Sequence, residues 1–197
     1  IRFSQNIKNL VIQSKDLNTL NRETLKPALD SDIYIVFGSS FIKGWLVDHL
    51  ISKNAINVHM GISPYYRGNS CNFWALYDSN PHLMGATIHM LGKGLDSGKI
   101  LYHVAPTTKN CSNPFDFTMM SVKSAHASLV KKLSSGELDI YDPVIQNSNL
   151  EIRNAKNSDF TDDVAKEFLD RKMSIEDIKN IINEKFNETD YIKPFIY

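Results

Sequence analysis

The stretch from residue 32 to residue 59 constrains the fold of this chain more than any other. A nearly continuous apolar run at 32–37 is followed by Gly38-Ser39-Ser40, a helical pattern over 41–51 and a short apolar run at 55–59. A strand, a glycine turn, a helix and a second strand in this order form a βαβ unit. Strands that are apolar along their whole length are typical of buried parallel sheets. The sequence therefore predicts an α/β fold with a mostly parallel sheet.

Other segments extend this alternation of strands and helices. Asn113-Pro114 indicates the start of a long helix, because proline is accepted in the first turn. Pro27 predicts that any helix around it is short or kinked. The remaining expected elements are strands at 7–13, 84–91 and 99–105 and helices at 22–29 and 113–133, with the first turns of a further helix at 72–76.

The composition changes after about residue 150, where Asn, Asp and Lys become frequent. Ser174 and Asp177 are spaced as in a capping box, and isoleucines at 175, 178 and 182 follow at helical spacing. An amphipathic helix of this kind packs on its own domain more often than it binds a partner. We expect a main domain at 1–150 and a small helical appendage at 151–197.

Charge and composition argue against several classes of function. Lys plus Arg and Asp plus Glu both number 22 among 197 residues, so the chain lacks the basic surplus of proteins that bind long nucleic acids. No apolar run reaches the length of a membrane span. Cys71 and Cys111 form no CxxC pair, which fits a reducing compartment, and the histidines form no HExxH motif. These features predict a cytoplasmic protein without a bound metal.

Three polar residues are candidates for an active site. Asn57 and His59 lie two positions apart in an expected strand, so both side chains project from the same face. Asp96 lies between two glycines, in a loop that could return a carboxylate to them. An amide donor, a titratable ring and an acid are the groups needed to move an acyl group onto an amine. Taken singly, each residue could instead cap a turn or form a hydrogen bond in the core.

The order and spacing of several motifs resemble a known family. The motifs are Asn57-x-His59, Ser63-Pro64-x-Tyr66-Arg67-Gly68, Gly85-Ala86-Thr87-Ile88-His89 and Gly94-Leu95-Asp96-Ser97-Gly98. Together they resemble the formyltransferases that use 10-formyltetrahydrofolate, which act on glycinamide ribonucleotide, on methionyl-tRNA or on amino sugars. The resemblance covers about residues 32–104. It implies a Rossmann-like sheet of the formyltransferase type, apparently lacking the family's first βα units, with 1–150 as an N-terminally incomplete catalytic domain.

The resemblance implies a role for each of the three candidates. Asn57 and a protonated His59 would stabilise the oxygen on which negative charge develops when the amine attacks the formyl carbon. Asp96 would orient His59, raise its pKa and help to accept the proton of the amine. The cosubstrate would be 10-formyltetrahydrofolate, and no metal is implied.

The resemblance also implies two segments that hold the pterin of the cosubstrate, largely through backbone groups. The matching residues are Phe41, Ile42, Lys43 and Trp45 in one segment and Leu91, Gly92, Lys93, Gly94 and Leu95 in the other. Apolar walls combined with main-chain donors and acceptors suit a flat pterin. Plain core packing remains an alternative for Phe41, Ile42 and Trp45.

The substrate is indicated by the residues after the second motif. Arg67 could bind a phosphate or carboxylate in bidentate fashion, or it could anchor its own turn. Asn72-Phe73-Trp74 resembles the sugar N-formyltransferases, in which Trp74 could stack on a ring or could belong to the core. The favoured substrate is a small amine, an amino sugar linked to a nucleotide, and the resemblance allows a homodimer. The alternatives are glycinamide ribonucleotide or methionyl-tRNA formyltransferase-like activity, a formyltetrahydrofolate hydrolase, and a non-catalytic folate-binding fragment.

Overall fold

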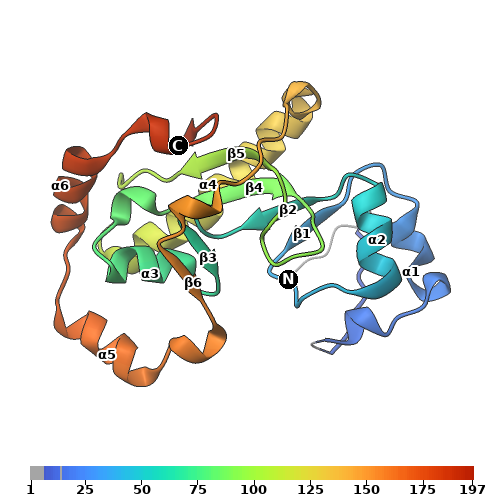
Figure 1. Ribbon diagram of the computed structural model, residues 1–197, viewed down its shortest axis with the longest axis horizontal. Helices are drawn as coiled ribbons and strands as arrows, with labels where there is room; N and C mark the ends of the chain where they lie inside the picture. Colours follow the sequence, from blue (N-terminus) through green and yellow to red (C-terminus); the bar gives the residue numbers. More distant parts are fainter. Residues whose placement is uncertain (1–6, 14) are drawn as a thin grey trace.

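The computed structural model describes residues 7–13 and 15–197, and a five-stranded sheet runs through its centre (Figure 1). The strands follow the order β1 (Ile35–Phe37), β2 (Ile56–His59), β4 (Ala86–Met90), β5 (Ile100–Ala105) and β7 (Phe195–Ile196). β1 is parallel to β2 and β7 is parallel to β5, whereas β4 is antiparallel to both of its neighbours. Four of these five strands therefore point in one direction, which confirms the mostly parallel sheet.

The helices and a second, smaller sheet surround these strands. Figure 1 shows α1 and α2 beside β1 at one end of the molecule and α3, α5 and α6 at the other. The helices are α1 (Arg22–Leu29), α2 (Gly44–Ser52), α3 (Cys71–Tyr77), α4 (Pro114–Ser134), α5 (Asp162–Asp170) and α6 (Ile175–Lys185). The second sheet pairs β3 (Tyr66–Gly68) in parallel with β6 (Arg153–Ala155). No helix among the described residues has both the length and the apolar composition needed to cross a membrane.

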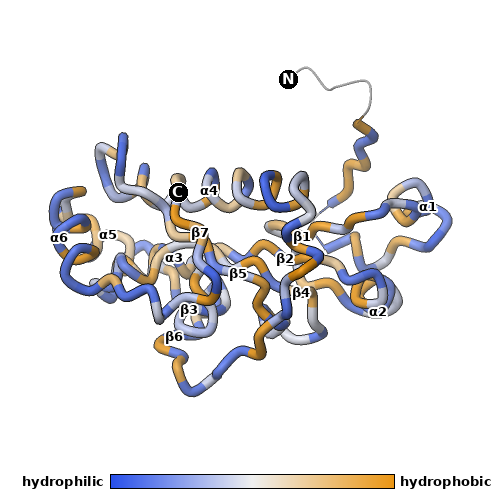
Figure 2. The backbone as a smooth tube through the Cα atoms, turned by 90° about the horizontal axis from the view of Figure 1, so that it is seen from above, coloured by the Kyte–Doolittle hydropathy of each residue, from blue (hydrophilic) through white to orange (hydrophobic). Residues whose placement is uncertain are grey.

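The long helix α4 covers one face of the sheet, above the strands in Figure 2. The Asn113 side chain accepts a hydrogen bond from the Asp116 backbone N–H, and Pro114 occupies the first turn, as the sequence predicted. Ala125 and Leu129 are buried against the sheet, in a cluster that includes Ile88. This packing fixes the sheet face on which α4 lies.

The C-terminal part of the chain shares a core with the part before residue 150. Trp74 and Phe117 pack in one buried cluster with Phe168 of α5 and Ile178 of α6. The predicted capping box at the start of α6 is present, with Ser174 and Asp177 bonded reciprocally. Residues before and after 150 thus share one hydrophobic cluster. The division into two domains at residue 150 stays a prediction.

Two expected strands differ in the structure. Residues 7–13 form no strand, and the Val11 side chain is 94% exposed. No neighbouring strand pairs with this apolar run in the described part of the chain, so its backbone forms no sheet hydrogen bonds. Of the expected strand at 32–37, only β1 is regular, and it lies at an edge of the sheet. Ile33, Ile35 and Phe37 are about half exposed, because only β2 pairs with this strand in the described part of the chain.

Candidate active site

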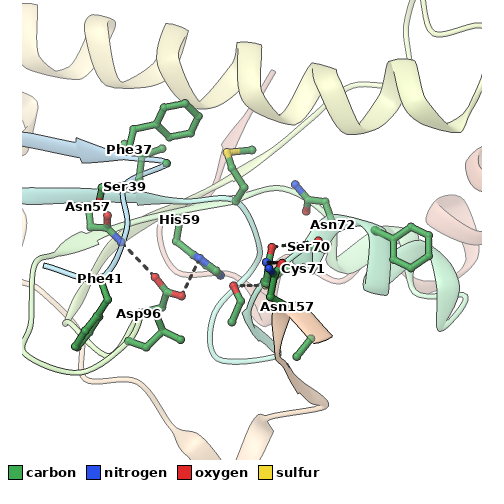
Figure 3. A pocket seen from close by; sticks show the side chains of 18 of the residues that line it. Phe37, Ser39, Phe41, Asn57, His59, Ser70, Cys71, Asn72, Asp96 and Asn157 are labelled. Atoms are coloured by element: carbon green, nitrogen blue, oxygen red, sulfur yellow. Dashed lines mark hydrogen bonds and ion pairs between the residues drawn. The ribbon is translucent and has the colours of Figure 1, made fainter. Parts of the chain in front are cut away.

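A cavity of about 1070 Å³ opens beside the ends of β1 and β2 (Figure 3). Its walls come from the loop after β1, the loop before β5, the start of α3, one side of α4 and the segment that follows β6. Asn57, His59 and Asp96 all line this cavity. Parts of the chain that lie far apart in sequence thus meet around one hollow.

The structure brings the three predicted catalytic residues together. The Asp96 carboxylate lies with Oδ2 3.3 Å from Nδ1 of His59 and with Oδ1 3.3 Å from Nδ2 of Asn57, as the dashed lines in Figure 3 show. Asp96 has a left-handed φ of 46°, which turns its loop back toward β2. Gly98 allows the same return, because a Cβ there would overlap the carbonyl oxygen of Met90. The predicted convergence therefore depends on a tight loop packed on β4.

The partners of His59 favour a protonated ring. Nδ1 faces the Asp96 carboxylate, and Nε2 lies 3.2 Å from the backbone oxygen of Tyr66. Both partners present only acceptor oxygens, so these contacts favour an imidazolium, with Nε2 donating to Tyr66 and Nδ1 paired with the Asp96 carboxylate. Burial alone would lower the pKa of His59, but the hydrogen bond to Asp96, with contributions from Cys71, raises it from 6.5 to about 10. Burial opposes ionisation of Asp96, yet His59 lowers its pKa overall.

His89 is a residue of this site that the sequence did not reveal. It lies on β4 directly opposite Asn57, and its Nε2 is 2.9 Å from Nδ2 of Asn57. Its Nδ1 donates to the backbone oxygen of Met90 at 2.8 Å, so Nε2 carries no proton and accepts from Asn57. Burial lowers the pKa of His89 to about 4, which keeps the ring neutral. Thr87 and His89 lie two positions apart in an apolar strand, so their side chains share one face, and this polar pair is the sequence signal that could have indicated His89.

Only some of the residues expected at the pterin line the cavity. Those that line the cavity are Phe41, Ile42, Leu91, Gly92, Gly94 and Leu95. Trp45 instead donates to the backbone oxygen of Leu20 at 3.2 Å, and Lys43 is exposed. Lys93 forms a surface ion pair with Asp48 at 2.8 Å. Lys43, Trp45 and Lys93 are therefore not among the described residues that line the cavity.

Arg67 and Trp74, the residues expected at the substrate, are also not among the described residues that line the cavity. Arg67 donates from Nη2 to the backbone oxygen of Leu95 at 2.9 Å, and its Nη1 lies 3.1 Å from Oε2 of Glu151. Trp74 is 3% exposed, with the Arg153 guanidinium 4.4 Å from its ring centroid. Phe73 lines the cavity instead, and its ring meets that of Phe160 edge to face at 4.7 Å.

The charge of His59 predicts how the stability of the protein depends on pH. Its pKa is about 10 when folded and 6.5 in its ordinary range, so folding favours the proton. The stabilisation is complete below pH 6.5 and is lost as the pH rises toward 10. The difference in Tm between the wild type and His59→Gln should therefore shrink over this interval. The exposed His126→Gln serves as the control, and a difference that grows with pH would contradict the charged ring.

Comparisons with known proteins agree with this arrangement. A family model described as "Formyl transferase" matches residues 18–133. Methionyl-tRNA formyltransferase from Borreliella burgdorferi (strain ZS7) is 31% identical over 189 residues, which are 92% of this chain and 55% of that protein. Formyltetrahydrofolate deformylase 2, mitochondrial, from Arabidopsis thaliana is 25% identical over 130 residues, 63% of this chain and 38% of that protein. The chain thus spans about two fifths to just over half of these two relatives.

Solved structures show the same fold. PseJ from Anoxybacillus kamchatkensis has a TM-score of 0.58 and 19% identity, covering 87% of this chain and 82% of its own. A 4-N formyltransferase from Francisella tularensis has a TM-score of 0.55 and 21% identity, covering 72% of this chain and 57% of its own. An N-formyltransferase from Helicobacter canadensis has a TM-score of 0.51 and 16% identity, covering 70% and 50%. The expected formyltransferase type of α/β fold is therefore confirmed.

Proposed function

The chain belongs to the formyl transferase family, and from this we propose that it transfers a formyl group from 10-formyltetrahydrofolate to a primary amine. One observation carries the proposal. At the wall of a large cavity, the Asp96 carboxylate lies 3.3 Å from Nδ2 of Asn57 and 3.3 Å from Nδ1 of His59, whose other ring nitrogen meets the backbone oxygen of Tyr66. An amide donor, a cation and an acid in this contact suit acyl transfer to an amine.

The cavity suits a folate. Phe41 and Ile42 of one loop and Leu91, Gly92 and Gly94 of another all line the cavity, so its wall combines apolar side chains with glycine residues. This combination binds a flat heterocycle, with walls for its faces and backbone groups for its edge. The PseJ structure contains tetrahydrofolate and the Helicobacter canadensis structure contains folinic acid, which supports a folate as the formyl donor.

Three side chains divide the chemistry of the transfer. Asn57 and His59 stabilise the negative charge that develops on the formyl oxygen as the amine attacks the formyl carbon. The N–H of Asn57 that meets Asp96 at 3.3 Å turns toward this oxygen, while the contact with His89 holds the amide in place. Asp96 keeps His59 protonated and accepts the proton that the amine releases. The bond between the formyl carbon and N10 of the folate then breaks, and this proton passes to N10 of the departing tetrahydrofolate.

The far end of the cavity accepts the amine. Phe73 and Phe160 form an aromatic wall there, and Asn154, Lys156 and Asn157 supply polar groups. Aromatic faces suit a base, and a lysine suits a phosphate. The PseJ structure holds a UDP-linked formamido sugar, and the Helicobacter canadensis structure holds dTDP-3-aminofucose. These features support an amino sugar linked to a nucleotide as the substrate. That the protein acts as a homodimer stays a prediction.

Hydrolysis of the formyl donor is the second candidate function. Water in place of the amine would use the same three side chains, and two deformylases are among the relatives. Formyl release from 10-formyltetrahydrofolate should be measured with and without a panel of nucleotide-linked amino sugars, amine-free nucleotide sugars serving as controls. Release that requires the amine supports transfer, whereas equal release without it identifies a hydrolase.

Binding of the non-reactive 5-formyltetrahydrofolate tests the donor site separately. A ligand that binds only the folded protein raises Tm by mass action, and 100 times its Kd contributes about 2.7 kcal/mol. We expect Tm to rise with 5-formyltetrahydrofolate concentration, and to rise further when a nucleotide-linked amino sugar is added. A Tm that does not respond to any folate would contradict the proposed donor.

A further inference from the structure

Residues 143–151 run beside the loop that carries Asp96. Val144 and Ile100 exchange two backbone hydrogen bonds, both of 2.8 Å, which fix this segment at the start of β5. Gln146 follows two positions later and reaches the loop with its side chain. A segment 50 residues from Asp96 in sequence is therefore in direct contact with the candidate active site.

A single nitrogen of Gln146 holds the loop on both sides of its turn. Nε2 donates to the backbone oxygen of Asp96 at 2.6 Å and to that of Gly98 at 2.7 Å. A reversed amide would place Oε1 against two carbonyl oxygens, so the orientation is determined by the partners. Because the left-handed φ of Asp96 is costly for a residue with a side chain, the loop needs contacts that hold it.

The same segment supports a second contact with the loop. Arg67 donates from Nη2 to the backbone oxygen of Leu95 at 2.9 Å. Its Nη1 is 3.1 Å from a carboxylate oxygen of Glu151, at the end of the segment. Carbonyl groups at 95, 96 and 98 are thus bonded by side chains that belong to residues 143–151 or depend on them.

We propose that Gln146 is a positioning residue, which holds the loop at 92–98 so that the Asp96 carboxylate faces His59. Its effect on turnover rests on the proposed function, whereas its effect on His59 does not. If the loop relaxes, the carboxylate moves away and the buried ring no longer has its counter-ion. The other titratable groups near His59 are Cys71, His89 and His103, and the substitution leaves them unchanged.

Two substitutions test this role. Gln146→Leu removes both donors, and the nearly isosteric Gln146→Glu places carboxylate oxygens against two carbonyl groups. For Gln146→Leu, the pKa of the His59 ring measured by NMR should fall, and for both variants kcat should fall roughly 10- to 100-fold, as a displaced catalytic group predicts. KM for the amine should change little. The same changes at the exposed Gln13 serve as controls and should alter none of these values.

Each outcome has a definite meaning. An unchanged pKa of His59 and an unchanged kcat in folded Gln146→Leu would overturn the proposal. A lower Tm without a change in either value would also overturn it, because Gln146 would then be only structural. If the wild type transfers no formyl group but the pKa of His59 falls in Gln146→Leu, the proposed function fails and the positioning role stands.

Discussion

Replacing Asp96 by asparagine is expected to lower kcat/KM for formyl transfer by roughly 100- to 1000-fold, the effect of losing a major electrostatic contact in acyl transfer. The change keeps the shape of the side chain but removes the charge 3.3 Å from Nδ1 of His59. Burial lowers the pKa of His59 and the largest opposing contact is then gone, so a larger share of the ring is neutral at pH 7. The variant therefore loses a cation and a proton acceptor in one step.

The pH dependence separates these two losses. Activity of Asp96→Asn should increase as the pH falls, because acid restores the proton on His59, whereas the wild type stays protonated across neutral pH. The measurement is kcat/KM against pH for both proteins. Asp170→Asn makes the same change at an exposed position on α5 and should behave as the wild type. A variant with more than about a tenth of the wild-type rate at pH 7 would remove Asp96 from the chemistry.

Replacing Asn57 by alanine should also lower kcat by roughly 100- to 1000-fold, the effect of deleting one donor to a developing oxyanion. Binding of 5-formyltetrahydrofolate should persist, because the cavity walls at the proposed pterin site are unchanged. Loss of Asn57 also leaves Nε2 of His89 without its donor at 2.9 Å, which should cost about 1–3 kcal/mol of stability.

Single-turnover rates and thermal unfolding distinguish these effects. Asn183→Ala, at an exposed position on α6, is the matched control and should change neither value. If Asn57→Ala lowers Tm but transfers formyl groups at the wild-type rate, Asn57 has only a structural role. If it loses folate binding as well, the amide contributes to binding rather than to the transition state.

Local patterns predicted the parts of this fold that depend on local geometry. The alternation in β2 placed Asn57 and His59 on one face, and the glycines around Asp96 predicted a loop that could turn back. The cap at Asn113 and the capping box of Ser174 were visible because each spans only a few residues. Such signals need no knowledge of distant parts of the chain.

Contacts between distant segments were beyond these patterns. His89 meets Asn57 across 32 residues because β4 runs antiparallel between β2 and β5, and no local period specifies that register. Trp74 and Phe73 are adjacent aromatics at the start of a helix, and only the packing of α5 and α6 decides that the first is buried and the second lines the cavity. The exposed side of β1 likewise follows from its place at an edge.

The cluster shared by α3, α4, α5 and α6 limits how the chain can be divided or recombined. Its apolar side chains lie on both sides of residue 150, so neither 1–150 nor 151–197 could keep Trp74 and Ile178 away from water alone. A chimaera that takes its last 47 residues from a relative must also adapt the surface of α3 on which they lie. The C-terminal helices and the wall of the cavity would therefore have to change together.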